Sequence, residues 1–127
     1  MYGIGIDIIE TKKIKKMFSR NGFLSKIFTD HEIEYCTRYK LKELHFAGRF
    51  AAKEAAFKAL GTGFGNGIEF RNVEVKNDRL GKPSLVFYGK AKRMVKLLKI
   101  TNILVTISHC DGYAITQVLL ERKLSER

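Results

Sequence analysis

The chain has 127 residues, of which 45% are hydrophobic and 29% are charged. A chain of this length and composition can bury the core of one ordinary domain, which excludes wholesale disorder, collagen-like repeats and low-complexity classes. No window holds the roughly 18 apolar residues that a membrane span needs, and the first ten residues lack the basic start of a secretory signal. The 24 Lys and Arg residues exceed the 13 Asp and Glu residues, giving a net charge of +11, which favours a polyanionic or phosphorylated partner.

Cys36 and Cys110 are the two cysteines, and neither lies in a CxxC pair. Two isolated thiols are typical of a reducing compartment rather than of a disulfide framework or a zinc site. We therefore expect two ordinary thiols, no zinc, and a cytoplasmic protein.

Residues 2–9 alternate in a way that predicts a β-strand. Three isoleucines share one face of this strand, and two glycines share the other face with Asp7: the sets are Ile4, Ile6 and Ile8, and Gly3, Gly5 and Asp7. The glycines leave a bare face, with room for another group to approach Asp7. The alternative is an ordinary edge strand whose aspartate lies in water.

The spacing predicts a helix over residues 10–20, with an apolar stripe of Ile14, Met17 and Phe18. Basic residues stack on another face at intervals of four, with a further one beside them: Lys12, Lys16 and Arg20, and Lys13. This face is either a docking ridge for an acidic partner or an ordinary solvated face.

The next elements are marked by capping and turn residues. The sequence Thr29-Asp-His-Glu32 has the form of a capping box and predicts a helix to about Tyr39. A second helix runs from about Glu43 to Leu60 and ends at Gly61. The loop over 61–67 alternates Gly with other residues and matches neither GxGxxG nor a Walker A loop.

The C-terminal half reads as strands, a turn and one more helix. The pattern predicts strands over 68–76, with a bulge near Asn72, and over 84–88, joined by a turn over 77–83, and then a basic helix over 90–99. Strands over 103–110 and 113–120 form a hairpin through Asp111-Gly112, a type I′ signal. We expect one α+β domain over residues 1–122, a small, mostly antiparallel sheet packed with a long central helix and shorter helices, and a polar tail over 123–127.

The segment from Phe46 to Leu60 contains several candidate functional residues. Phe46, Phe50, Phe57 and Leu60 cluster on one side of the helix, and alanines cover most of the rest, so we expect packing on several sides. The same helix carries Arg49, Lys53, Glu54 and Lys58. Glu54 and Lys58 form an ordinary ion pair if this part of the helix lies at the surface. If the helix is buried, each charge taken out of water needs a partner or a metal. Lys53 receives no role.

Four segments in this order along the chain resemble holo-[acyl-carrier-protein] synthase, the small bacterial type of 4′-phosphopantetheinyl transferase. They are Gly5-Ile6-Asp7, Phe50-Ala-Ala-Lys53-Glu54-Ala-Ala-Phe-Lys58-Ala-Leu-Gly61-Thr-Gly63, Gly81-Lys82-Pro83 and Ser108-His109. The resemblance covers residues 2 to about 122, and its specific part is the Lys-Glu-Ala-x-x-Lys helix with the upstream Gly-Ile-Asp strand.

The resemblance implies transfer of the 4′-phosphopantetheine arm of coenzyme A to a serine of apo-acyl carrier protein, with release of adenosine 3′,5′-bisphosphate, in fatty acid biosynthesis. It implies a divalent cation on the pyrophosphate, Mg²⁺ or in its place Mn²⁺, with Asp7 and Glu54 as its protein ligands. Lys58 would hold the same phosphates and stabilise the leaving group. The expected catalytic residues are therefore Asp7, Glu54 and Lys58, with Glu54 as the base for the serine proton, directly or through a metal-bound water.

The resemblance also implies binding residues. For coenzyme A they are Lys58, His109 near the nucleotide and its 3′-phosphate, Arg49 as a second phosphate contact, and Gly81, Lys82 and Pro83 beside the adenine. Taken without the resemblance, His109 is an ordinary strand-end histidine and the Gly-Lys-Pro turn needs no function. The acidic acyl carrier protein is expected on the first helix, at Lys12, Lys13, Lys16, Met17 and Arg20.

The resemblance also implies a homotrimer in which each active site lies between two subunits. The alanine-rich sides of the long helix and the apolar hairpin strands fit burial at such a contact, and they fit a core equally well.

The main alternative is a small basic nucleic-acid-binding domain, favoured by the charge and by the 11% of aromatic residues. Against it, the phenylalanines lie on helix faces at core spacing, and no RRM, KH or zinc pattern is present. A structural module without chemistry is the third alternative. We expect the enzyme, with neither nucleic acid nor a membrane as its partner.

Overall fold

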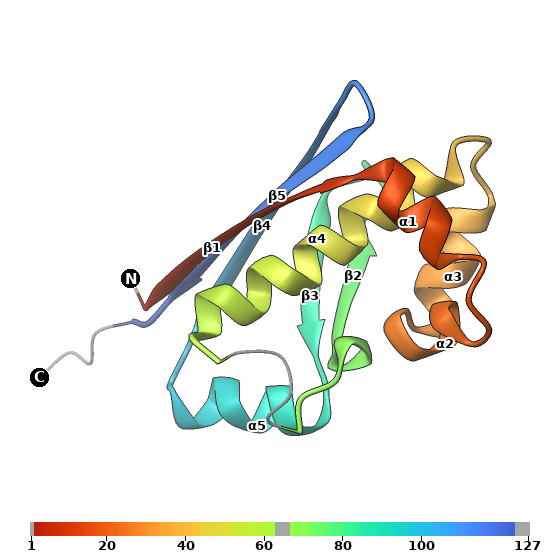
Figure 1. Cartoon of the computed structure of the whole chain (residues 1–127). Coiled ribbons are helices and arrows are strands. Elements are labelled where there is room, and N and C mark those ends of the chain that lie inside the picture. Colours follow the sequence, from red (N-terminus) through yellow and green to blue (C-terminus); the bar gives the residue numbers. More distant parts are fainter. Residues whose placement is uncertain (1, 63–66, 124–127) are drawn as a thin grey trace, which may run out of the picture.

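The computed structural model describes residues 2–62 and 67–123, which form one α+β unit, as predicted (Figure 1). The elements are β1 (Gly3–Glu10), α1 (Thr11–Met17), α2 (Phe23–Ile27), α3 (Asp30–Thr37), α4 (Lys42–Leu60), the 3-10 turn η1 (Phe70–Asn72), β2 (Val73–Asn77), β3 (Pro83–Phe87), α5 (Gly89–Leu97), β4 (Asn102–Cys110) and β5 (Tyr113–Glu121). Among these helices, none has the length and apolar character needed to cross a membrane.

Two antiparallel sheets flank the long helix α4. One sheet has the strand order β1-β5-β4, and the other pairs β2 with β3. Figure 1 shows α4 running diagonally between them, with α5 closing one end of the molecule and α1 to α3 gathered at the other. The helix therefore contacts β1 and β5 on one side and β2 on another.

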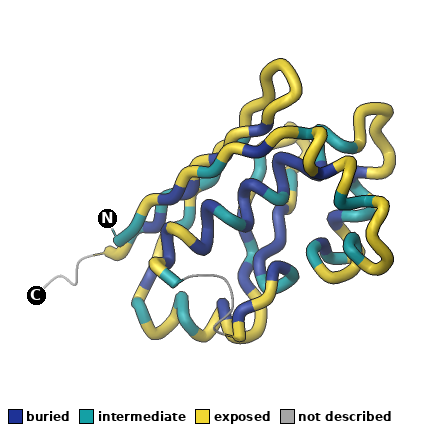
Figure 2. Tube along the Cα trace, in the orientation of Figure 1, coloured by how far each residue is buried: buried dark blue, intermediate teal, exposed yellow. Residues whose placement is uncertain are grey.

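The burial of α4 follows from its small residues. All of its alanines are at most 3% exposed, and they lie in the core together with Phe46, Phe57 and Leu60. Figure 2 shows the helix as buried along most of its length. This confirms the packing on several sides, and it assigns the alanine-rich sides of the helix to the core of one chain.

The glycine face of β1 is filled by the backbone of α4. A Cβ atom at Gly3 would lie 2.0 Å from the carbonyl oxygen of Ala59, and one at Gly5 would lie 1.9 Å from that of Ala55. The glycines leave room for another group to approach, as expected, and that group is the backbone of α4. The same contact turns the isoleucines of the opposite face outward, where Ile6 is 54% exposed.

We predict that Gly5→Ala lowers the free energy of unfolding by about 3 kcal/mol, since α4 has to move away from β1 to admit one methyl group. Gly22→Ala is the control. Gly22 has a positive φ of 75°, but no atom lies within 4 Å of the position that a Cβ would occupy. This variant therefore measures only the cost of backbone strain, which is about 1 kcal/mol of unfolding free energy. Urea unfolding at equal protein concentration measures both variants. Equal losses would contradict the close packing of β1 on α4.

Two predicted elements are shorter than expected. The first helix ends at Met17, and Arg20 lies in the turn that follows, where its amide donates to the Met17 carbonyl at 3.1 Å. The strand predicted over 68–76 begins only at Val73, because η1 precedes it. The Asn72 side chain accepts from the Glu69 amide at 2.8 Å and stabilises this turn, which accounts for the slip in the apolar pattern near Asn72.

The capping and turn predictions are confirmed. Thr29 and Glu32 form the capping box of α3, Gly61 ends α4 with a φ of 78°, and Asp111 and Gly112 both have the positive φ that a type I′ turn requires. Gly63 and Gly65 of the predicted loop lie outside the described residues, as does all of the predicted tail except residue 123.

Candidate functional site

Asp7 and Glu54 line one cavity. We call it the carboxylate cavity; it has a volume of about 370 Å³ and is lined by Asp7, Ile8, Ile9, Glu10, Lys13, Met17, Phe50, Glu54 and Tyr113. Asp7 comes from β1 and Glu54 from α4, so the contact between these two elements brings the carboxylates to the same space. Lys13 and Met17 reach it from α1, so two of the predicted carrier-binding residues lie beside the predicted catalytic ones.

Lys58 holds Asp7 in place. Its ammonium group donates to Asp7 Oδ1 at 3.0 Å and to the Ile6 carbonyl at 2.9 Å, and the Asp7 side chain is 17% exposed. Burial raises the pKa of Glu54, the charge of Asp7 raises it further, and the charge of Lys58 opposes both effects. The three predicted catalytic residues therefore form one electrostatic group.

The donor set of the carboxylate cavity fits a hard divalent cation. Mg²⁺ prefers oxygen and keeps several waters, so two carboxylates with substrate phosphates are a normal ligand set. The mutual repulsion that raises the pKa of Glu54 is relieved when a cation lies between it and Asp7. Within residues 2–62 and 67–123, no group of three or more His, Cys, Asp and Glu residues is arranged to hold a metal.

A second cavity gathers most of the predicted nucleotide residues. We call it the arginine cavity; it has a volume of about 170 Å³ and is lined by Tyr35, His45, Gly48, Arg49, Asn77, Gly81, Pro83, Ile107 and His109. The predicted residues Arg49, Gly81, Pro83 and His109 converge here from three segments. Gly48 is required for this convergence, because a Cβ there would lie 3.0 Å from His109 Nε2.

Arg49 is a buried cation that faces this cavity. It is 3% exposed, its guanidinium group donates to the Asn77 side chain, and it lies 4.0 Å over the ring of Tyr35. Within the described part of the chain it has no ion pair, and its buried Nε has no hydrogen-bond partner. A buried guanidinium without a carboxylate is costly in isolation and suits an anionic ligand.

The two cavities open on different sides of α4. Arg49 and Glu54 are five positions apart on this helix, which places their side chains about 140° apart around its axis. No residue lines both cavities. Lys58 lies with Asp7, and Lys82 is exposed and lines neither cavity. One chain therefore does not join the predicted catalytic residues and the predicted nucleotide residues in a single cleft.

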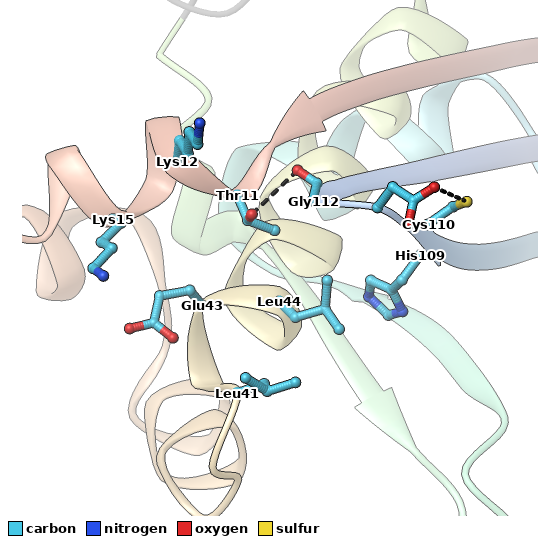
Figure 3. A pocket seen from close by; sticks show the side chains of 10 residues that line it. Thr11, Lys12, Lys15, Leu41, Glu43, Leu44, His109, Cys110 and Gly112 are labelled. Carbon is cyan, nitrogen blue, oxygen red and sulfur yellow. Dashed lines mark hydrogen bonds between the residues drawn. The ribbon is translucent and has the colours of Figure 1, made fainter.

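A third cavity is lined by some residues of the predicted docking ridge, while others line the carboxylate cavity. This hairpin cavity, of about 480 Å³, lies between α1, the start of α4 and the β4–β5 hairpin, as Figure 3 shows. Lys12 and Lys15 line it, whereas Lys13 faces the carboxylate cavity. The Thr11 hydroxyl, which donates to the Gly112 carbonyl at 3.1 Å, fixes the start of α1 to the hairpin. His109 lines both this cavity and the arginine cavity.

Sequence reasoning missed several residues of these cavities. Glu10 adds a third carboxylate to the lining of the carboxylate cavity, and Tyr35, His45 and Asn77 complete the arginine cavity. Their only signal in the sequence is residue type, since the topology alone brings their segments together.

Lys53, which had no predicted role, is fully buried. It pairs with Glu32 at 2.7 Å and donates to the carbonyls of Phe70, at 3.1 Å, and Val73. The other oxygen of Glu32 accepts from the Val75 amide at 3.0 Å. This network ties α3, η1 and β2 to α4 on the side of the helix next to Glu54.

Comparisons with known proteins identify the family of the chain. The 4′-phosphopantetheinyl transferase superfamily matches residues 3–118. The chain is 40% identical over 124 residues to a holo-[acyl-carrier-protein] synthase of Geotalea daltonii, covering 96% of this chain and 99% of the relative. It is 46% identical over 114 residues to that of Protochlamydia amoebophila, covering 88% and 91%.

Solved structures are similar over nearly the whole chain. A holo-(acyl-carrier-protein) synthase of Bacillus anthracis in complex with CoA (3′,5′-ADP) has a TM-score of 0.80 and 39% identity, and covers 96% of this chain and 97% of its own. The enzyme of Neisseria meningitidis has a TM-score of 0.86 and 34% identity, with coverage of 96% and 99%.

Proposed function

The chain belongs to the 4′-phosphopantetheinyl transferase superfamily and is an enzyme of the holo-[acyl-carrier-protein] synthase type, and on this premise we propose its reaction, sites and assembly. It transfers 4′-phosphopantetheine from coenzyme A to a serine of apo-acyl carrier protein, releases adenosine 3′,5′-bisphosphate and serves fatty acid biosynthesis in the cytoplasm. The observation that carries the proposal is the single cavity shared by Asp7, Glu54 and the α1 residues Lys13 and Met17. A nucleic-acid-binding role is not favoured by the comparisons.

The carboxylate cavity supplies the chemistry. Asp7 and Glu54 would hold Mg²⁺, which neutralises charge on the pyrophosphate when it is bound. Glu54 accepts the proton of the attacking serine hydroxyl, because its carboxylate lies beside the α1 residues where the carrier docks. The ammonium group of Lys58 lies beside the Asp7 carboxylate, where it stabilises the negative charge of the departing phosphate.

The arginine cavity binds the nucleotide end of coenzyme A. The buried Nε of its Arg49 has no acceptor among the described residues, and His109 flanks the same space. Gly81 and Pro83 form the wall on which the adenine rests, and the exposed Lys82 adds positive charge at its rim.

The separation of the two cavities supports an active site shared between subunits. We infer a homotrimer in which coenzyme A spans the carboxylate cavity of one subunit and the arginine cavity of its neighbour. A contact surface is available on the outer sheet face, which we define as the exposed apolar residues Ile4, Ile6, Ile8, Leu104, Tyr113 and Ile115. The strand register places Ile8 opposite Ile115, Leu119 between Ile4 and Leu104, and Gln117 opposite Ile6, and exposed apolar patches rimmed by polar residues mark interaction sites.

Ile6→Asp is expected to dissociate the trimer and to reduce transfer at least tenfold, because it introduces a charge into the centre of the apolar contact. Sedimentation or light scattering coupled to gel filtration measures the mass. Leu97→Asp is the matched control, since Leu97 is 82% exposed on α5 and lines neither the carboxylate cavity nor the arginine cavity. A wild-type protein that is monomeric at working concentrations would overturn the trimer.

Lys13→Glu combined with Arg20→Glu is expected to raise the KM for apo-acyl carrier protein about tenfold at low salt and the KM for coenzyme A much less. Both side chains are exposed, and each reversal replaces attraction to an acidic partner with repulsion. The difference should shrink as ionic strength rises. Steady-state kinetics with each substrate varied measures the effect, with Lys92→Glu in the exposed face of α5 as the control. Equal changes in both KM values would count against carrier docking on α1.

The proposed function is tested by incubating the protein with coenzyme A, Mg²⁺ and apo-acyl carrier protein and measuring the mass of the carrier. A gain of one phosphopantetheine, together with released adenosine 3′,5′-bisphosphate, is the expected result. An unchanged carrier mass under conditions in which coenzyme A binds would overturn the proposed transfer.

A further inference from the structure

The arginine cavity holds a second histidine beside Arg49 and His109. His45 lies one turn before Arg49 on α4 and stacks on the ring of Tyr39, with centroids 3.9 Å apart. Its ring lies 6.2 Å from that of His109, which belongs to β4. Three groups that can carry positive charge therefore face one small space from two elements.

The surroundings of His45 contain no compensating acid among the residues that line the cavity. The titratable and charged groups that face it are Arg49 on its own helix, His109 on β4, Tyr35 on α3 and Tyr39 after α3. Burial lowers the pKa of His45, and the positive charges of Arg49 and His109 lower it further. Burial also lowers the pKa of His109; a hydrogen bond with the Leu44 backbone opposes this shift, and the charge of Arg49 adds to it. Both imidazoles are thus neutral at neutral pH.

The size and the charge of the cavity select a small anion. A volume of about 170 Å³ is below the roughly 300 Å³ at which cavities begin to enclose whole small molecules, so it admits a part of the nucleotide. A phosphate monoester carries nearly two negative charges at neutral pH, and it supplies the acceptors that Arg49 Nε lacks within residues 2–62 and 67–123.

Resting on the proposed function, we propose that His45 joins Arg49 and His109 in binding the phosphate monoester of the coenzyme A nucleotide, and that it does so as the imidazolium, taking up a proton from solvent when the phosphate enters. The negative charge of the phosphate offsets the burial and the repulsion from Arg49 and His109 that together disfavour the charged form of the free imidazole. Affinity for the monoester then rises as pH falls through the range in which His45 is protonated only in the complex.

The test compares wild type with His45→Phe, which keeps a ring to stack on Tyr39 and removes the titrating group. Calorimetric titrations with coenzyme A at about pH 8 and about pH 6.5, in buffers of different ionisation enthalpy, measure both the affinity and the protons taken up. For wild type we expect proton uptake and an affinity gain toward low pH about tenfold larger than for His45→Phe, the change that follows from a one-unit pKa rise on binding. His45→Arg should bind at both pH values with reduced uptake.

Two further comparisons distinguish phosphate monoester binding by His45 from other roles of this residue. With 3′-dephospho-coenzyme A, which lacks the monoester, the difference between wild type and His45→Phe should vanish; its persistence would assign His45 to the pyrophosphate and overturn the proposal. Equal uptake and equal pH dependence in the two proteins would also overturn it, although carrier modification by wild type would leave the proposed function intact. An absence of both nucleotide binding and transfer in wild type would instead contradict the proposed function, and the inference with it.

Discussion

Glu54→Gln and Asp7→Asn are each expected to lower kcat/KM for phosphopantetheine transfer by about 10³-fold or more while the fold is retained. Both substitutions keep the shape of the side chain and remove the charge that would hold the divalent cation, whose stabilisation of a developing phosphate charge is worth several kcal/mol. Both carboxylates line the carboxylate cavity at its surface rather than inside the core, so neither change opens a void. The transfer assay by carrier mass measures the loss.

Metal binding gives a readout that does not depend on turnover. Titration with Mn²⁺ in the presence of coenzyme A should show one bound ion in wild type and at least tenfold weaker binding in Glu54→Gln. Glu34→Gln is the matched control, since the Glu34 side chain is 74% exposed on α3 and pairs only with Arg38 at 3.5 Å. Full activity of either variant at low metal concentration would remove these residues from the metal site.

Lys53→Met is expected to lower the free energy of unfolding by about 3 to 5 kcal/mol, which is large against the stability of a domain of this size. The substitution leaves the fully buried carboxylate of Glu32 without its charged partner at 2.7 Å, and it removes one hydrogen-bond donor from each of the carbonyls of Phe70 and Val73. An uncompensated buried charge costs more than the pair contributes. Urea unfolding at a fixed protomer concentration measures the change.

The double variant Glu32→Gln/Lys53→Met identifies the cause. Removing both charges should recover a substantial part of the stability that Lys53→Met loses, because no unpaired ion then remains in the core. A double variant that is as unstable as the sum of the single changes would indicate that packing, rather than the unpaired charge, dominates.

The local elements were largely predictable because their signals are short-range. The box of Thr29 and Glu32, the left-handed Gly61 and the Asp111-Gly112 turn each fix the backbone through contacts within a few residues. The boundaries were less predictable. The helix expected to reach Arg20 ends at Met17, and the strand expected from residue 68 begins at Val73, because competing turns decide where these elements end.

The faces of β1 show where sequence periodicity stops being informative. Alternation correctly separates the isoleucines from Gly3, Gly5 and Asp7, but it does not say which face is buried. The face with less side chain is the buried one, because only glycine lets the backbone of α4 come close enough to contact the strand. In the single chain the hydrophobic face is the exposed one.

The sequence by itself determined the class of fold and the presence of the Lys-Glu-Ala-x-x-Lys helix, since periodicity, capping and motif spacing are properties of neighbouring residues. The roles expected for Asp7 and Glu54 came from the family resemblance and stay predictions. Only the tertiary structure decided that Arg49 and Glu54 open onto separate cavities, that Lys53 is neutralised by Glu32, and that His45 faces Arg49 and His109. These facts depend on how α4 is rotated between two sheets, and that rotation is set by the summed packing of residues that are distant along the chain.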